Sequence, residues 1–144
     1  MEDKTKKNGS IEYKDVVTVF LSRRNKILIL RRSEKVGTYR GSWAGISGYL
    51  EKSPIEQAYT EILEETGLTA QDVILIKEGD PVLVLDRENQ RAWRVHPFLF
   101  AAKYPEKIRL DWENVEMRWV RPDELKYFNT VPDLDRALES VFKE

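Results

Sequence analysis

The sequence predicts a mixed α/β fold of the α+β kind, in which helices cover a mixed β-sheet. Short segments rich in β-branched and aromatic residues alternate with polar turns along most of the chain, which is typical of strands. Two segments, residues 54–66 and 133–142, instead repeat their apolar residues with helical spacing. Strands interleaved with two helices favour one sheet with helices packed against it.

Length and composition predict one domain. The 144 residues show no break in composition, so we expect a flexible N-terminus at residues 1–10 and a single domain at residues 11–144. A formal net charge of −1 gives no electrostatic reason to expect nucleic acid as a partner. The absence of cysteine excludes a disulfide framework and thiol chemistry. No apolar run approaches the ~18 residues of a membrane span, so we expect a cytoplasmic protein without a membrane partner.

The first two strands are expected to form a hairpin. Residues 15–21 are rich in β-branched and aromatic side chains, and residues 27–30 form a second apolar run, with a polar turn at residues 23–26 between them. A loop that ends at Trp43 follows. Its four basic residues form either a solvated surface or a contact with an anionic ligand: Arg31, Arg32, Lys35 and Arg40.

The helix at residues 54–66 has clear signals at both ends. Ser53 is a typical N-cap, and Pro54 suits the first helical position. Glu56 stands three residues after Ser53, which predicts a capping box. Gly67 supplies the left-handed residue that commonly ends a helix.

Three carboxylates occupy one face of this helix. Glu61, Glu64 and Glu65 stand at positions i, i+3 and i+4, so they fall within an arc of about 100°. A solvated acidic face would cost only roughly 0.2–0.5 kcal/mol per like-charged pair, which a protein tolerates easily. A site for a hard divalent cation would use the same oxygen ligands. The spacing alone does not decide between these interpretations.

The rest of the chain predicts further strands and the second helix. The expected strands are residues 73–76, 81–85, 93–102 and 116–121. Pro97 lies within the long strand 93–102, and it favours an edge position or a bulge because proline has no N–H to donate. Residues 122–125 predict a helical turn, and residues 133–142 predict an amphipathic helix with four inward positions: Leu134, Ala137, Leu138 and Val141.

Three stretches resemble the Nudix hydrolase family. Glu61-Ile-Leu-Glu-Glu-Thr-Gly-Leu68 resembles the second half of the Nudix signature, G-x5-E-x7-R-E-U-x-E-E-x-G-U, where U is a bulky aliphatic residue. Residues 43–51 resemble the glycine-rich loop that leads into it, and residues 112–125 resemble a downstream acidic pattern. The resemblance covers most of residues 15–125, and it implies a Nudix-like α/β/α sandwich around the mixed sheet.

The signature is partly degenerate in this chain. The family pattern has an arginine before the first helical glutamate, where it usually holds a catalytic glutamate in place, but this chain has Thr60. If Gly48 is the signature glycine, Glu61 follows it by 61 − 48 = 13 residues, whereas the pattern requires fifteen. The loop is therefore two residues short, and Glu51 partly replaces the carboxylate that is lost.

The resemblance implies hydrolysis that depends on Mg²⁺ or Mn²⁺. The bond broken would be the pyrophosphate of a nucleoside diphosphate linked to another group: a nucleoside triphosphate, a nucleotide sugar, ADP-ribose or a dinucleotide. Glu61 and Glu65 would be metal ligands, and the Gly48 carbonyl would complete the metal site. Glu64 would be a ligand or would orient water, so Glu61 and Glu64 are the expected catalytic residues. The expected partner is a small nucleotide diphosphate.

Substrate contacts are expected from other segments. Arg32 and Arg40 would reach the phosphates, and Trp93 would stack on a base. Glu113 and Glu116 are candidates for an additional acid, although an ordinary exposed acidic loop explains either one. The lone histidine, His96, and the strand residue Phe98 are expected to be structural.

The resemblance leaves one alternative to hydrolysis open and argues against another. A Nudix-fold nucleotide-binding module with weak or no catalysis is favoured by the short loop and Thr60, but the three retained carboxylates oppose it. Isomerisation of an isoprenoid diphosphate, which also occurs in the family, relies on a cysteine that this chain lacks. A homodimer is compatible with either function.

Overall fold

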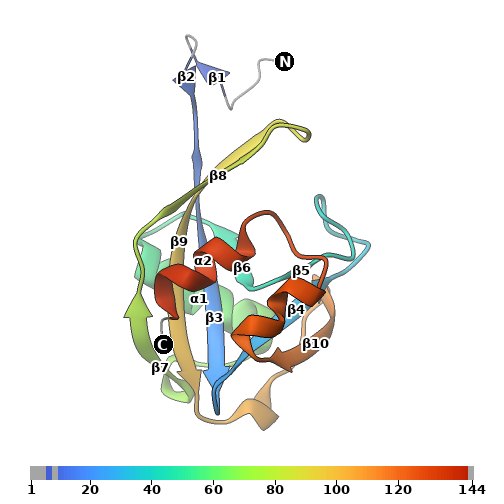
Figure 1. Ribbon diagram of the computed structural model, residues 1–144. Helices are drawn as coiled ribbons and strands as arrows, with labels where there is room; N and C mark the ends of the chain where they lie inside the picture. The colour runs from blue at the N-terminus through green and yellow to red at the C-terminus, as the bar shows by residue number, and fades with distance from the viewer. Residues whose placement is uncertain (1–5, 8–9, 143–144) are drawn as a thin grey trace.

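The computed structural model describes residues 6–7 and 10–142. It is built on one large mixed sheet with a helix on each face (Figure 1). The strands of this sheet are β3 (Lys14–Arg23), β4 (Lys26–Arg32), β5 (Trp43–Ala44), β6 (Ile46–Tyr49), β7 (Val73–Glu78), β8 (Val82–Asp86), β9 (Arg91–Ala102) and β10 (Asn114–Val120). The two helices are α1 (Pro54–Thr66) and α2 (Leu134–Val141). Short 3-10 turns occur at Ala70–Asp72, Pro105–Lys107 and Pro122–Tyr127, and the last of these includes the predicted turn at residues 122–125.

The predicted fold class is confirmed. The strand order is β10-β4-β3-β9-β7, while β5 pairs with β4, β6 with β3 and β8 with β9. The pairing of β3 with β9 is parallel, and the other pairs in this sheet are antiparallel, so the sheet is mixed. Within the described residues, no helix is long and apolar enough to cross a membrane.

Alternating side chains of the central strand β3 supply two separate cores. Val17, Val19 and Leu21 belong to the core under α1, whereas Phe20 belongs to the core under α2. Successive strand residues point to opposite faces, so α1 and α2 must lie on opposite sides of the sheet. Figure 1 shows this arrangement, with α2 in front of the sheet and α1 behind it.

The predicted β3–β4 hairpin is present but short. Arg24 and Asn25 form its turn, and both have positive φ angles (52° and 65°), which matches the right-handed twist of paired strands. Two residue pairs follow the turn before the strands part: Ser22 with Ile27 and Arg23 with Lys26. Farther along, β3 pairs with β6, and β4 pairs with β10 and β5. The hairpin therefore splits, and it admits the glycine-rich segment into the sheet.

Helix α1 begins and ends where its sequence predicts. The Ser53 hydroxyl accepts a hydrogen bond from the Glu56 N–H (3.4 Å), and Pro54 is the first helical residue. Gly67 has φ 77° and donates its N–H to the Leu63 carbonyl (2.9 Å). The capping box differs in one bond, because the Glu56 carboxylate accepts from the Ser53 hydroxyl (2.7 Å) and not from its backbone.

Two predictions about the strands were wrong. The glycine-rich segment, predicted as a loop, forms β5 and β6. Pro97 is not on an edge strand, since β9 has β3 on one side and β7 and β8 on the other. Pro97 lies where β7 ends and β8 has not begun, and its carbonyl accepts from Gly79 in the connecting turn (2.9 Å). The missing N–H therefore breaks no strand pairing.

The predicted flexible segment, residues 1–10, falls largely outside the described residues. Its described part includes β1 (Lys6–Lys7), which pairs with β2 (Ser10–Ile11) in an antiparallel arrangement.

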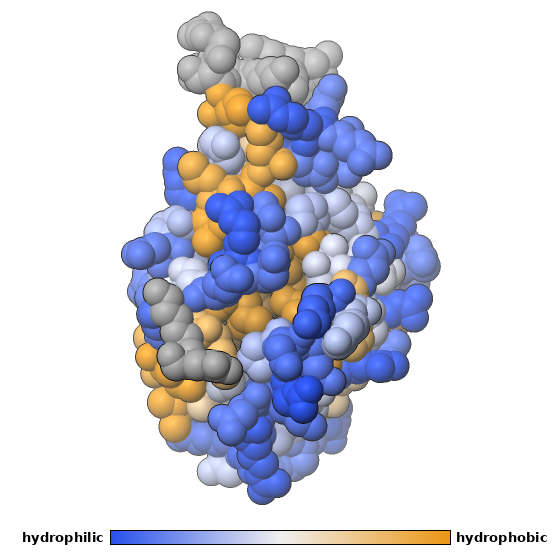
Figure 2. Space-filling model, in the orientation of Figure 1, coloured by the Kyte–Doolittle hydropathy of each residue, from blue (hydrophilic) through white to orange (hydrophobic). Residues whose placement is uncertain are grey.

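The strand β7, at one end of the strand order of the large sheet, exposes apolar side chains (Figure 2). They include Ile74 and Ile76, which are 53% and 54% exposed.

Candidate active site

The first acidic residue of α1 lies directly against the glycine of β6. Glu61 is buried, with 8% of its surface exposed, and its carboxylate faces Gly48. A Cβ atom at position 48 would lie only 2.5 Å from each carboxylate oxygen of Glu61, so only glycine leaves room for this contact. The Gln57 side chain, one turn earlier on α1, donates from Nε2 to Glu61 Oε2 (2.8 Å).

The second buried acid, Glu65, joins three parts of the chain. Its Oε2 accepts from the Ser47 N–H on β6 (3.1 Å), and its Oε1 accepts from Asn114 Nδ2 at the start of β10 (3.1 Å). Asn114 is itself buried. Glu65 on α1 is therefore fixed between two strands that are remote from each other in sequence.

Two further acids lie near this buried pair. Glu64 projects from α1 into solvent, and Glu113 is half-buried just before β10. Both act electrostatically on Glu61, and Glu113 also acts on Glu65. We call Glu61, Glu64, Glu65 and Glu113 the acidic cluster.

Burial and mutual repulsion raise the pKa values within the acidic cluster. Burial raises the pKa of Glu61 to about 7, the hydrogen bond from Gln57 opposes this rise, and the charges of Glu64 and Glu113 add to it. Burial raises the pKa of Glu65 well above its ordinary value, although the Asn114 hydrogen bond opposes the shift. The pKa of Glu113 is raised by burial and by Asp111, against the charge of Arg32.

The carboxylate oxygens of the acidic cluster suit a hard divalent cation as ligands. Every hydrogen-bond donor to Glu61 and Glu65 is neutral: the Gln57 amide, the Ser47 N–H and the Asn114 amide. The ionised forms of these carboxylates therefore lack a compensating positive charge. Mg²⁺ and Mn²⁺ take such carboxylate oxygens, together with backbone carbonyl oxygens, as ligands. In the part of the chain that the structure describes, no three acidic or histidine side chains are already gathered at metal-binding distance. An ion would therefore draw the exposed Glu64 or the half-buried Glu113 inward.

The two candidate arginines, Arg32 and Arg40, donate hydrogen bonds to backbone carbonyls of the loop at residues 33–42. Arg32 Nε donates to the Thr38 carbonyl (3.0 Å), and Arg40 Nε donates to the Val36 carbonyl (2.9 Å). Arg32 is close enough to Glu113 for its charge to lower the pKa of that carboxyl, so it lies beside the acidic cluster. Arg40 is exposed.

Trp93 lies on the α2 side of the sheet. It packs partly against the core under α2, and its ring lies 5.9 Å from that of Tyr39 between centroids. The Tyr39 hydroxyl donates to Asp86, and both residues line an open depression of about 610 Å³ beside the β8–β9 turn. No local sequence pattern predicted the position of Tyr39.

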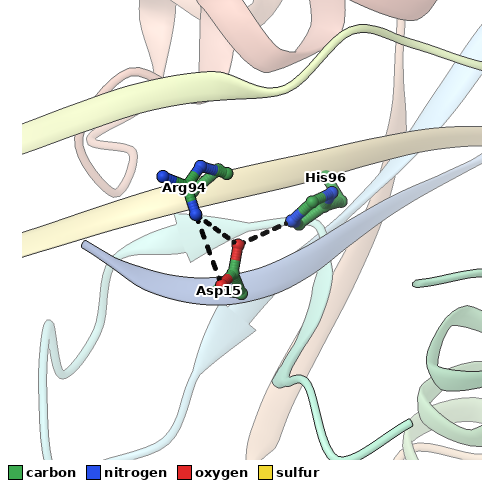
Figure 3. Close-up of polar contacts among 3 residues, drawn as sticks. All are labelled: Asp15, Arg94 and His96. Carbon is green, nitrogen blue, oxygen red and sulfur yellow. Dashed lines mark hydrogen bonds and ion pairs between the residues drawn. The ribbon is translucent and has the colours of Figure 1, made fainter. Parts of the chain in front are cut away.

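Glu116, Phe98 and His96 have interactions that do not involve the acidic cluster. Glu116 forms ion pairs with Arg31 (3.6 Å) and Arg118 (3.3 Å). Phe98 is fully buried, as expected for a core residue. His96 Nε2 lies 2.9 Å from Asp15 Oδ1, and Arg94 contacts the same carboxylate (Figure 3). These contacts join the parallel strands β3 and β9, which agrees with a structural His96.

The two side chains that donate hydrogen bonds to the buried acids Glu61 and Glu65 were not predicted from the sequence. Gln57 stands four residues before Glu61, and this helical spacing was the available signal. Asn114 follows the predicted candidate Glu113, but its contact with Glu65 spans 49 residues and has no local signal.

Comparison with known proteins places the chain in a family. The model of the NUDIX domain matches residues 12–141. A NUDIX hydrolase from Nitrosomonas europaea has a similar structure, with a TM-score of 0.71 and 20% identity over 90% of this chain and 88% of that one. An Ap4A hydrolase from C. elegans gives a TM-score of 0.70 and 13% identity over 88% and 93% of the two chains. A dihydroneopterin triphosphate pyrophosphohydrolase from E. coli gives 0.71 and 17% over 88% and 94%. The chain therefore belongs to the NUDIX domain family, and it is a Nudix-type pyrophosphohydrolase.

Proposed function

We propose that this enzyme hydrolyses the pyrophosphate bond of a nucleoside diphosphate linked to another group, with Mg²⁺ or Mn²⁺ as cofactor. The observation that carries the proposal is the contact between Glu61 and Gly48 inside the acidic cluster. It leaves a buried carboxylate with a raised pKa against a backbone segment that has no side chain. A divalent cation would supply the missing positive charge.

The residues divide the work as follows. Glu61, Glu65 and the Gly48 carbonyl would hold the ion, and the half-buried Glu113 would be the additional acid that joins them. A divalent cation bound there would supply positive charge for the pyrophosphate and make the attacking water more acidic. Glu64 is exposed, so its carboxylate can turn toward that water and orient it, or turn inward as a further ligand. Glu116 has no part in this proposal, because Arg31 and Arg118 already neutralise it.

Substrate recognition is assigned to the loop at residues 33–42 and its neighbours. Arg32 and Arg40 bind phosphate oxygens with guanidinium groups that the loop carbonyls already orient. Trp93 stays a prediction as the residue that stacks on the base, because it lies beside Tyr39 on the α2 side of the sheet, whereas the acidic cluster lies on the α1 side. Two of the similar proteins are described as acting on Ap4A and on dihydroneopterin triphosphate, both of which contain linked phosphates, and this supports the substrate class.

A product analysis tests this proposal. The protein is incubated with nucleoside triphosphates, nucleotide sugars, ADP-ribose, dinucleotides and a nucleoside monophosphate, with Mg²⁺, Mn²⁺ or a chelator. We expect a nucleoside monophosphate and a second phosphate product, only when the metal is present. Glu61→Gln should abolish turnover, whereas the matched control Glu116→Gln should keep it. Release of inorganic phosphate from the monophosphate alone would contradict the proposal, and binding without turnover would favour the binding module.

Three further predictions from the sequence accompany this proposal. They are a cytoplasmic location, a single domain at residues 11–144, and a homodimer. Two features of the edge strand β7 would favour self-association. Its apolar side chains are exposed, and an open sheet edge presents backbone groups that can pair with another chain. Sedimentation of the full chain at several concentrations tests the homodimer.

A further inference from the structure

Among the described residues, the side chain of Thr60, at the position where the signature has arginine, forms no hydrogen bond with the acidic cluster. The Thr60 hydroxyl accepts a hydrogen bond from Lys52 Nζ (2.7 Å), and this pair lies at the surface. The charges that act most strongly on Glu61 are those of Glu64, Glu113 and Glu51, and Lys52 is not among them. Neither Thr60 nor Lys52 therefore holds Glu61 in place.

Gln57 makes the contact that position 60 lacks. Its side chain is almost completely buried, with 3% exposed, and both ends of its amide are engaged. Nε2 donates to Glu61 Oε2 (2.8 Å), while Oε1 accepts from the Glu51 N–H (2.9 Å). A buried amide with both ends bonded cannot rotate without losing a hydrogen bond, so its direction is fixed.

This bond fixes the Glu61 carboxylate from a second side. Gly48 limits the carboxylate on the β6 side, and Gln57 holds one of its two oxygens. No hydrogen bond from a described residue engages the other oxygen, Oε1, which could therefore bind an ion. A neutral donor also leaves the negative charge of Glu61 uncompensated, whereas an arginine would partly neutralise it.

The same amide anchors the shortened loop. Glu51 lies in the segment that is two residues shorter than the signature, and its N–H is bonded directly to Gln57 Oε1. One buried side chain thus connects the loop to the first acid of α1. We propose that Gln57 is the positioning residue for Glu61, in place of the signature arginine, a role that rests on the proposed metal-dependent hydrolysis.

The test removes the Nε2 donor and keeps the volume. Gln57→Met has a similar shape but cannot donate to Glu61. We expect kcat to fall about 10–100-fold, the range typical of lost partners behind metal ligands, with KM nearly unchanged. The rise in melting temperature that Mn²⁺ gives the wild-type protein should shrink in parallel. Gln57→Glu serves as a second variant, because it keeps an acceptor for the Glu51 N–H and changes the group that faces Glu61.

Two controls separate positioning from general stability. Thr66→Val removes a buried hydroxyl of the same helix that bonds the Ile62 carbonyl (2.6 Å) and lies outside the cluster. It should lower the melting temperature without changing kcat or the Mn²⁺ response. Lys52→Met tests the rival cation and should behave as the wild-type protein.

The outcomes distinguish the two proposals. If both Gln57 variants keep the wild-type kcat and Mn²⁺ response, or if they lose stability alone as Thr66→Val does, the positioning role is overturned. Loss of turnover in Lys52→Met with full turnover in Gln57→Met would assign the role to Lys52. A wild-type protein without metal-dependent turnover or Mn²⁺ response would overturn the proposed function itself.

Discussion

Two carboxylates of this protein show how their surroundings set the direction of a pKa shift. Glu61 is buried among like charges with a single neutral donor, and its pKa rises to about 7. Asp15 is partly exposed beside His96 and Arg94, and the hydrogen bond from His96 is the largest of the effects that lower its pKa. Asp15 is thus stabilised as an anion by its own neighbours, whereas burial and nearby like charges disfavour the anionic form of Glu61.

This difference predicts how pH affects the metal-free protein. The pKa of Glu61 is 4.5 ordinarily and about 7 in the fold, so the fold favours the protonated acid. Its stabilising contribution is complete below pH 4.5 and is lost as pH rises toward and through about 7. Glu61→Gln stays neutral, so the variant should gain stability relative to the wild-type protein across this window. Urea unfolding in EDTA at several pH values measures the difference. A difference that does not depend on pH would contradict the assigned pKa.

The acids were predictable from the sequence, but their partners were not. Glu61, Glu64 and Glu65 share a helix face, and that geometry follows from local spacing. Gln57 shows no local signal of its burial, but in the fold it is buried and its amide is bonded to Glu51 in the loop before α1 and to Glu61. The contact of Asn114 with Glu65 exists only because β10 pairs with β4 and begins beside α1. Tertiary packing creates both contacts, so local spacing cannot reveal them.

At the scale of elements, the site depends on how α1 meets β6. The ends of α1 follow from Ser53, Pro54 and Gly67, whose signals are local. The two-residue strand β5 and the four-residue strand β6 have no comparable signal, since each forms only where β4 or β3 offers a partner. The same reason explains the wrong edge assignment of Pro97. The ends of α1 were therefore predictable, because local sequence signals set them. The strands β5 and β6 were not, because pairing with β4 and β3 determines them.

The contact between α1 and β6 gives a prediction for Gly48→Ala. The alanine keeps the backbone carbonyl, but its Cβ would lie 2.5 Å from both Glu61 carboxylate oxygens, so the carboxylate must move. We expect kcat to fall by at least tenfold and overpacking to cost about 1–3 kcal/mol of stability. Turnover and urea unfolding are the measurements. Gly37→Ala is the matched control for stability, because no atom lies within 4 Å of its added Cβ, and its urea unfolding should match that of the wild-type protein. Full activity in Gly48→Ala would show that Glu61 does not need this position.

At the scale of the whole molecule, the acidic cluster lies where three distant segments meet. Ser47 and Gly48 come from β6, Glu61 and Glu65 from α1, and Asn114 from the start of β10. Unfolding any of the three elements would separate the acids from their partners. An ion bound there would stabilise the whole fold, because it binds the folded chain and not the unfolded one.

Glu65→Gln tests this link between metal binding and global stability. The replacement keeps the shape, and Asn114 can reverse its amide to accept from the new NH₂ group. Without metal, the variant should be at least as stable as the wild-type protein, since a neutral amide replaces an acid whose charged form is disfavoured by burial. With Mn²⁺ at about 100 times its Kd, the wild-type protein should gain about 2.7 kcal/mol, and the variant should gain much less.

Thermal melts with and without Mn²⁺, together with turnover, measure these effects. Turnover of Glu65→Gln should fall by orders of magnitude in parallel with the lost stabilisation. The control Glu116→Gln changes an acid of the same type that is already paired with Arg31 and Arg118, so it should keep both the turnover and the Mn²⁺ response. If Glu65→Gln also keeps both, the ion does not bind Glu65. The buried acids Glu61 and Glu65 would then have only a structural role, and Glu64 would be a solvated surface residue.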